Sequence, residues 1–379
     1  MAGKICKSNQ RNFKPMIEIF GPTYRYSGEI LTKPEILYIN DHHYDEENQC
    51  FHIKTLLENS QCDPQQHLLV FDHINHDDEL TGYNSICLPV FLAAEVNEFI
   101  RQKIVPDWNN KTHTFNFMIN KPRMHREFLL LLIEYFGLSN YTYSLPWKKI
   151  NVRRSTLKKL INNSLYEKII NDTEIVIAPT NYAFGSEITL DQGIKNGNYQ
   201  NAETYNHLLK TNVFEPSCIS LITEPSFFEK ETLHTEKTIM AFYGGTLPIW
   251  VGGWKLATYA RSIGFDIFDD IIDHSYEMFD DPWDRCFNAI KLNLDLLKDF
   301  DRVKNFIGQN QMRLKHNIDL IETNPFLTKI IKIVESYNEP VRSQLFSIVS
   351  TYRHNMFKSF TEIRLLGERI GKSGQIYKR

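Results

Sequence analysis

The spacing of apolar residues and turn residues predicts a strand–helix–strand unit in the second half of the chain. Residues 218–223 form a short, β-rich and mostly apolar run, which is the pattern of a buried strand. Good helix formers follow Thr235, a residue type that caps helix N-termini, and the glycines at 244–245 end that helix. Residues 247–251 are again apolar and β-rich. This order indicates a βαβ unit with parallel strands.

Beyond that unit the pattern becomes mostly helical. Residues 256–262 predict a short helix that stops at Gly264, and residues 265–268 alternate apolar and polar side chains like a strand. From Trp283 onward the chain has the pattern of successive helices, divided by prolines such as Pro325.

The first half alternates strands with helices, which indicates a second parallel α/β domain. The expected elements are strands at 35–40, 67–72, 86–90 and 114–120 and helices at 92–104 and 127–137. Residues 171–215 are polar and rich in Gly and Asn, so we place the domain junction near residue 200. The predicted domains are residues 1–200 and 201–325, followed by a helical, basic tail at 326–379.

Composition narrows the class of protein. The 379 residues are 42% hydrophobic and suffice for two ordinary domains. A net charge of −3 excludes a protein that binds nucleic acid through its overall charge. The six cysteines lack metal-binding spacing, so we expect reduced thiols. The N-terminus is polar, and no apolar run has the roughly 20 residues that span a bilayer. We therefore expect a cytoplasmic protein, or a virion-associated one if the source is a virus.

The chemistry of the predicted βαβ unit is concentrated at the start of its helix, in Glu236 and Lys237. A helix N-terminus presents N–H groups and partial positive charge to an anion, and Lys237 would add a full charge for a diphosphate. Glu236 only accepts hydrogen bonds when ionised, which suits a pair of ribose hydroxyls. Both residues follow the carboxyl end of a strand, the edge at which open α/β sheets bind ligands. The alternative is an exposed ion pair on a surface helix.

Two stretches of this unit resemble the donor-binding motif of the α1,3-fucosyltransferases. They are Thr-Glu-Lys at 235–237 and Gly-Thr-Leu-Pro-Ile-Trp-Val-Gly at 245–252. Upstream, Glu224 and Ser226 match the Phe-Glu-Asn-Ser element of that family, whereas Pro225 replaces its Asn. The resemblance covers only part of the chain. It implies the GT-B fold, in which two Rossmann-like domains face a cleft, and a nucleotide-sugar bound at these residues.

A second passage is similar to the glycosyltransferase-like proteins of large DNA viruses, phages and bacteria. It comprises residues 256–268, the Ser-Tyr pair that ends at Tyr276, and the segment 280–285. The similarity implies that Tyr276 stacks on the base of the donor or bonds its phosphate. The alternative is that Tyr276 and Arg285 cap and staple loops.

A basic helix start at Arg123 and Arg126 is the second candidate for anion binding. It follows Pro122, which suits a first helical turn, and the two arginines share one helix face because they are three residues apart. We expect them to reach the donor phosphates or an acidic acceptor from the opposite domain. The same viral and bacterial proteins have a similar Arg-x-x-Arg helix start. A solvated basic turn is the alternative.

Transfer to an acceptor needs a base that takes the acceptor's proton, and a polar loop after the strand at 67–72 offers several. The candidate catalytic residues are Asp72, His73, His76 and Glu79, with Asp77 beside them. In the GT-B fold such a base would come from the N-terminal domain, across the cleft from the donor. A plain polar loop is one alternative, and a metal site that also uses His42 and His43 is another.

No metal cofactor is expected, because Lys237 and the two arginines can stabilise the leaving diphosphate. The acidic pairs at 269–270 and 280–281 resemble the metal-binding pairs of another transferase fold, but we interpret them as solvated turns.

The sequence therefore predicts a metal-independent glycosyltransferase that moves a sugar from a nucleotide-sugar to a glycan. The donor is GDP-fucose by resemblance, although other UDP- or GDP-hexoses fit the same chemistry. Two alternatives stay open. One is a transferase that acts on modified DNA and contacts it through the basic tail and the basic segment 147–159. The other is a non-catalytic nucleotide-binding, glycan-binding or structural protein with the same fold.

Overall fold

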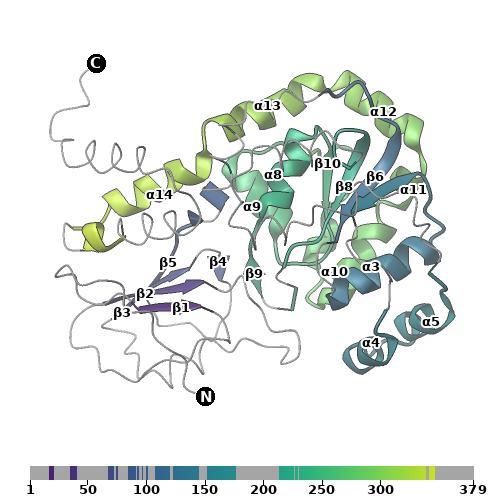
Figure 1. Cartoon of the computed structure of the whole chain (residues 1–379), viewed down its shortest axis with the longest axis horizontal. Coiled ribbons are helices and arrows are strands. Elements are labelled where there is room, and N and C mark those ends of the chain that lie inside the picture. Colours follow the sequence, from purple (N-terminus) through teal and green to yellow (C-terminus); the bar gives the residue numbers. More distant parts are fainter. Residues whose placement is uncertain are drawn as a thin grey trace, which may run out of the picture.

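The computed structural model has a mixed α/β architecture with two parallel sheets (Figure 1). The described residues are 17–20, 35–40, 67–71, 74–75, 84–90, 92–93, 96, 100, 107–119, 123–144, 152–175, 213–225, 227–228, 230–338 and 341–345. The α/β class predicted from the sequence is confirmed. None of the helices among these residues is long and apolar enough to cross a membrane.

Both four-stranded sheets consist of parallel neighbours. The first has the order β1-β2-β3-β5, with strands Ile17–Phe20, Glu35–Asn40, His67–Phe71 and Asn84–Cys87. The second has the order β10-β8-β6-β7, with strands Leu247–Trp250, Ser217–Ile222, His113–Met118 and Tyr141–Ser144. Every residue of β8 is buried, as its nearly continuous apolar run requires.

Helices cover both faces of the second sheet. The helices that precede β8 in the chain are α3 (Met124–Tyr135), α4 (Arg154–Leu160) and α5 (Ser164–Asp172). Those after β8 are α8 (Glu236–Tyr243), α9 (Leu256–Ile263), η2 (Ser275–Met278), α10 (Pro282–Lys291), α11 (Leu294–Lys298), α12 (Phe300–Gln309) and α13 (Gln311–Glu322). The last described helix, α14 (Pro325–Glu335), lies on the side of the first sheet (Figure 1). The predicted helical region after Trp283 is thus present, and one helix starts at Pro325.

The predicted βαβ unit is present as β8, α8 and β10. Thr235 is the N-cap of α8, and its hydroxyl accepts a hydrogen bond from the backbone N–H of Lys237. The helix ends at Gly244, and Gly245 has a φ of 59°, a left-handed conformation that glycine adopts without a steric penalty.

The chain leaves the centre of the second sheet in both directions. From β6 it passes through α3 to β7, and from β8 it passes through α8 to β10. Because parallel crossovers are right-handed, α3 and α8 lie on opposite faces. Their apolar side chains belong to two separate buried clusters, and Figure 1 shows α8 and α3 on opposite sides of the sheet. The topological switch point of this sheet therefore lies between β6 and β8.

Strands β6 and β7 belong to the second sheet, although the predicted boundary near residue 200 placed both in the N-terminal domain. In the pairing of β6 with β8, Phe115 lies beside Ile219 and Phe117 beside Leu221. All four side chains are buried in one apolar cluster, which explains why β6 pairs here. Among the described residues, the division between the two sheets falls between β5 and β6.

The loops that follow the carboxyl ends of β3 and β8 pair with each other (Figure 1). The short strand β4 (Ile74–Asn75) comes after β3, and β9 (Glu231–Thr232) comes between β8 and α8. The two strands are antiparallel. Because β3 and β8 belong to different sheets, this pairing links the carboxyl edges of both sheets.

The strand predicted at 265–268 is absent. The backbone of Asp266 bonds instead to the side chain of Asn317 in α13. The Asp266 N–H donates to Asn317 Oδ1 at 2.8 Å, and Asn317 Nδ2 donates to the Asp266 carbonyl at 2.7 Å. Phe268 has a φ of 62°, outside the range of strand residues. The alternating pattern therefore reflects a loop packed under α13.

Strand β10 is at the edge of its sheet, and two side chains from the region of η2 cover it. The Tyr276 hydroxyl accepts a hydrogen bond from the Trp250 N–H at 3.1 Å. His274 Nε2 lies 3.2 Å from the Pro248 carbonyl, to which it donates. Covered backbone groups of an edge strand cannot pair with another chain.

We predict that Tyr276→Phe lowers the free energy of unfolding by about 1–3 kcal/mol, because a buried N–H loses its acceptor. Tyr276 is 1% exposed, so water cannot replace the hydroxyl. Chemical denaturation measures the effect. The control Tyr135→Phe, at a side chain that is 43% exposed, should change the stability by less than about 0.5 kcal/mol. Equal stability of both variants would contradict this role of Tyr276.

Candidate functional site

The carboxyl edge of the second sheet at its switch point brings together most of the described site residues. Helix α3 begins here after β6, and α8 begins after β8. Open α/β sheets bind ligands at such a switch point, where adjacent helices diverge to opposite faces. The predicted donor-binding residues at this edge are Arg123, Arg126, Glu224, Thr235, Glu236 and Lys237.

The Lys237 ammonium group is buried, since the residue is only 7% exposed. It donates to Thr235 Oγ1 at 3.2 Å and to Glu236 Oε1 at 3.0 Å, which accounts for two of its three N–H groups. The side chains of Lys237 and Glu236 are 9% and 13% exposed. The alternative of an exposed ion pair on a surface helix is therefore wrong.

Glu236 keeps its negative charge at this site. Burial alone would raise its pKa, but the charge and the hydrogen bond of Lys237 oppose burial, and the pKa falls below its ordinary value. Glu236 is thus a carboxylate that can only accept hydrogen bonds.

Glu224 connects the end of β8 to the start of α8. Its carboxyl group accepts hydrogen bonds from the Thr235 N–H at 2.9 Å and from the Thr235 hydroxyl at 2.5 Å. It also lies 2.8 Å from Thr238 Oγ1. Glu224 is 2% exposed, and burial raises its pKa although the charge of Lys237 acts in the other direction. In this structure Glu224 orients the Thr-Glu-Lys helix.

The basic start of α3 holds the loop after β8 through three consecutive backbone carbonyls. Arg126 Nη2 donates to Thr223 at 3.1 Å, His125 Nε2 to Glu224 at 3.1 Å, and Arg123 Nη1 to Pro225 at 2.9 Å. The sequence placed these arginines on the opposite domain. Instead they act from the same sheet, because β6 is the neighbour of β8. The helix is buried along its first turns, so the alternative of a solvated turn is also wrong.

Tyr276 and Arg285 hold loops in place. Arg285 is 2% exposed. It donates to the carbonyls of Phe279 at 2.9 Å, Asp280 at 2.8 Å and Phe227 at 3.3 Å. The Tyr276 hydroxyl binds the edge of β10, as described above. The geometry favours the structural interpretation of both residues over contact between Tyr276 and a donor.

A tight contact holds the loops after β8 and β10 together. Gly252 has a φ of 85°, and a Cβ at this position would lie 2.4 Å from the Phe227 ring. The same ring also contacts His125, whose imidazole stacks on it with centroids 4.7 Å apart. A glycine is therefore required at 252, which explains one of the two glycines that the motif at 245–252 has in common with the fucosyltransferases.

Several predicted site residues lie outside the described part of the chain. They are Ser226, the candidate bases Asp72, His73, His76 and Glu79, the neighbouring Asp77, and the candidate metal ligands His42 and His43. Within the segment 72–79 the structure describes β4, whose partner β9 ends three residues before Thr235.

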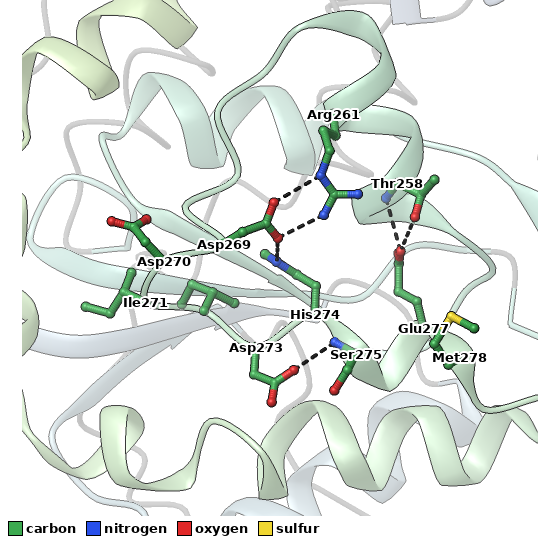
Figure 2. A pocket seen from close by; sticks show the side chains of 11 residues that line it. Thr258, Arg261, Asp269, Asp270, Ile271, Asp273, His274, Ser275, Glu277 and Met278 are labelled. Atoms are coloured by element: carbon green, nitrogen blue, oxygen red, sulfur yellow. Dashed lines mark hydrogen bonds and ion pairs between the residues drawn. The ribbon is translucent and has the colours of Figure 1, made fainter.

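A cavity of about 530 Å³ lies beside β10, between α9 and the loop 269–278 (Figure 2). Several of its charged groups have partners within the protein. Arg261 donates to Asp269 at 2.8 and 3.0 Å, and Asp269 also lies 3.1 Å from His274 Nδ1. Glu277 accepts from the first backbone N–H groups of α9. The residues that line the cavity therefore have structural roles: Glu277 caps α9, and His274 covers β10.

The acidic pairs at 269–270 and 280–281 are used by the fold. Asp269 and Asp270 lie in a turn with side chains 50% and 55% exposed, as predicted, and they also form ion pairs with Arg261 and Arg313. Asp281 caps α10 by accepting from two backbone N–H groups. Within the described ranges, no group of three or more His, Cys, Asp or Glu side chains is arranged to hold a metal ion.

The sequence analysis missed two buried histidines at this edge, His125 and His234, both 3% exposed. His234 Nε2 donates to the Leu256 carbonyl at 3.0 Å, and its Nδ1 lies 3.0 Å from Thr238 Oγ1. Each histidine directly adjoins a residue that was singled out: His125 precedes Arg126, and His234 precedes Thr235. That adjacency was the signal available in the sequence.

Comparisons with protein-family models, with curated proteins and with solved structures found no match. Function is therefore inferred from the residues and their geometry.

We predict that His125 makes stability fall as the pH decreases from 7 to 5. Burial, followed by the charges of Arg126 and Arg123, holds the pKa of His125 well below its ordinary value of 6.5. Below pH 6.5 the unfolded chain binds a proton at this residue and the folded chain does not, so unfolding becomes easier. Chemical denaturation at both pH values should show that the loss of stability is smaller in His125→Gln by up to about 2 kcal/mol, because other buried histidines such as His234 still contribute to it. The same loss in the variant would contradict this assignment.

Proposed function

We propose that the chain is a metal-independent glycosyltransferase of the GT-B type, which binds a nucleotide-sugar at the switch point between β6 and β8. The observation that carries this proposal is the pairing of β4 with β9. It connects the carboxyl edge of the first sheet to the segment directly before α8. A donor held at the start of α8 and a base that follows β3 would then meet at one edge, as transfer to an acceptor requires.

Features at the start of α8 support a diphosphate there. The first N–H groups of the helix and its partial positive charge favour an anion. The Lys237 ammonium is buried beside them and has one N–H beyond its two bonds to described residues. The arginines of α3 contact the loop that leads into this helix. Charge-assisted hydrogen bonds to phosphate are stronger than neutral ones.

The sugar-nucleoside part of the donor is proposed to contact Glu236. Its lowered pKa keeps it ionised, so it can accept hydrogen bonds from two ribose hydroxyls. The resemblance of residues 235–237 and 245–252 to the α1,3-fucosyltransferases supports this assignment and makes GDP-fucose the first donor to test.

The base is proposed to be one of Asp72, His73, His76 and Glu79. The support is positional: β4 lies inside this segment, and its pairing partner β9 is followed closely by the capped start of α8. A carboxylate or imidazole in this segment suits removal of a proton from an acceptor hydroxyl.

A glycan is favoured over DNA as the acceptor, because the basic segment 147–159 is partly engaged within the protein. Arg153 pairs with Glu127 at 2.7 Å. Arg154 donates to the carbonyls of Ile170 and Thr173. Binding to DNA gains its affinity from basic side chains that neutralise phosphates.

One observation favours a second candidate, a non-catalytic protein with the same fold. The cations Lys237, Arg123 and Arg285 all donate to acceptors of this chain, and these bonds already stabilise the edge. Pro225 also stands where the fucosyltransferases have an Asn.

We predict that Lys237→Ala weakens binding of GDP or UDP by roughly 2–4 kcal/mol, because charge-assisted bonds to the diphosphate are lost. Titration calorimetry measures the affinity, and circular dichroism and the melting temperature report the fold. The matched control is Lys255→Ala, an exposed lysine at the start of α9, which should keep the affinity of the unchanged protein. Unaltered affinity in a folded Lys237 variant would refute the donor site.

We further predict that the protein releases nucleoside diphosphate from one member of a panel of nucleotide-sugars, and that this release persists in EDTA. Cations of the protein replace a metal in stabilising the leaving group. Binding without release across the panel, with glycan acceptors present, would support the non-catalytic candidate. Activity lost in EDTA and restored by Mn²⁺ would contradict a metal-independent enzyme.

A further inference from the structure

The hydroxyl of Thr238, in the first turns of α8, lies among three polar groups that are all buried. Trp250 Nε1 is 3.0 Å from Thr238 Oγ1, His234 Nδ1 is also 3.0 Å away, and Glu224 Oε1 is 2.8 Å away. Trp250 belongs to β10 and Thr238 to α8, whereas Glu224 and His234 lie in the segment between β8 and α8. Their side chains form a continuous polar path from Glu224 to His234 inside the protein.

The number of protons on this path follows from donor and acceptor chemistry. A hydroxyl has one hydrogen to donate and two lone pairs that accept. The indole N–H of Trp250 can only donate, so it occupies one lone pair. Of the two remaining neighbours, one must accept the Thr238 proton and the other must donate. Leu256 offers a carbonyl at 3.0 Å from His234 Nε2, which places a hydrogen on that nitrogen.

Two arrangements satisfy all these contacts. In one, Glu224 is protonated and donates to Thr238, which donates to the neutral imidazole of His234. In the other, His234 is an imidazolium that donates to Thr238, which donates to the Glu224 carboxylate. Both arrangements contain one proton shared by Glu224 and His234. With no shared proton, two acceptors would face each other in a buried site, at a cost that folded proteins avoid.

We propose that Glu224, Thr238 and His234 form a buried proton relay that retains one proton, and that this proton rests on Glu224. The proposal is independent of the proposed glycosyltransferase activity. Transfer along the relay is balanced: the Glu224 proton moves to Thr238 as the Thr238 proton moves to His234 Nδ1. No proton enters or leaves, and the neutral pair becomes a carboxylate and an imidazolium.

The surroundings favour the neutral arrangement. Burial raises the pKa of Glu224, and burial also lowers the pKa of His234 to about 4. On α8, Lys237 and Glu236 face Glu224 with opposite charges. From α3, His125 donates to the backbone carbonyl of Glu224. The His234 imidazole also stacks on the ring of Tyr259 in α9, with centroids 5.5 Å apart. Separation of charge in such a dry site is costly.

The relay has a positioning role. Glu224 accepts hydrogen bonds from the backbone and hydroxyl of Thr235, which is the N-cap of α8. In a protonated Glu224, Oε2 accepts from the Thr235 hydroxyl, while Oε1 directs its proton to Thr238 and keeps a lone pair for the Thr235 N–H. The relay thus fixes the start of α8 without a second buried negative charge beside Glu236.

Two spectroscopic measurements on the full chain test the relay at pH 7. Nitrogen-15 NMR of labelled histidines reports which ring nitrogens carry hydrogen, and His234→Gln assigns the signals. Infrared difference spectroscopy detects the carbonyl stretch of a protonated carboxyl group, and Glu224→Gln assigns that band. We expect His234 to be neutral with hydrogen on Nε2, and a carboxylic acid band that disappears in Glu224→Gln.

Variants separate the relay from general packing. Glu224→Gln should keep the His234 signals, because an amide nitrogen at the position of Oε1 still donates to Thr238, although it no longer accepts from the Thr235 N–H. Thr238→Val should shift the Nδ1 signal of His234, because that nitrogen loses its donor. The matched control Thr246→Val removes another buried hydroxyl, bonded to the Ala241 carbonyl at 2.8 Å, and should leave His234 unchanged.

Three outcomes would overturn the proposal. One is an imidazolium at His234 with an ionised Glu224, and another is a neutral His234 without a carboxylic acid band. The third is an equal response of the His234 signals to Thr238→Val and Thr246→Val, which would reduce the contact to packing.

Discussion

The carboxyl edge of the second sheet depends on how the carbonyl groups of the buried loop after β8 are satisfied. A loop that follows an interior strand carries polar backbone groups that water cannot reach, and each needs a donor. The carbonyls of residues 223–225 obtain three donors from the first turn of α3. Because α3 follows β6, this arrangement requires β6 and β8 to be neighbours. The same loop carries Glu224, which caps the start of α8. One short loop thus fixes two helices on opposite faces of the sheet.

This arrangement concentrates charge where the dielectric constant is low. Lys237 is neutralised mainly by Glu236, one residue away, and Glu224 is kept close to both. Buried ion pairs seldom add much stability, because removing charges from water costs about as much as their attraction returns. Such groups do restrict the geometry of a site. The edge is therefore organised before any ligand arrives, which lowers the entropy cost of binding.

Local signals could be predicted from the sequence, and long-range partners could not. The Thr235 cap, the glycine stop and the two apolar runs lie within a short segment, so β8, α8 and β10 were predicted correctly. The pairing of β6 with β8 joins segments about a hundred residues apart, and a period of two residues does not encode a partner. The positions of Glu236 and Lys237 followed from the cap. The roles of Arg123 and Tyr276 could not be predicted, because their partners are backbone atoms that are distant in the sequence.

The core of the first sheet is completed from the far end of the chain. Val70 of β3 lies in the same buried cluster as Phe326 and Val334, which belong to α14. Just before that helix, Asn324 Nδ2 donates to the Ala93 carbonyl at 2.8 Å. Proteins emerge from the ribosome N-terminus first, yet this sheet needs a helix that is made after more than 300 residues. The buried cluster that contains Val70 therefore stays incomplete through most of synthesis, and loss of α14 would leave some of its apolar side chains open to aggregation.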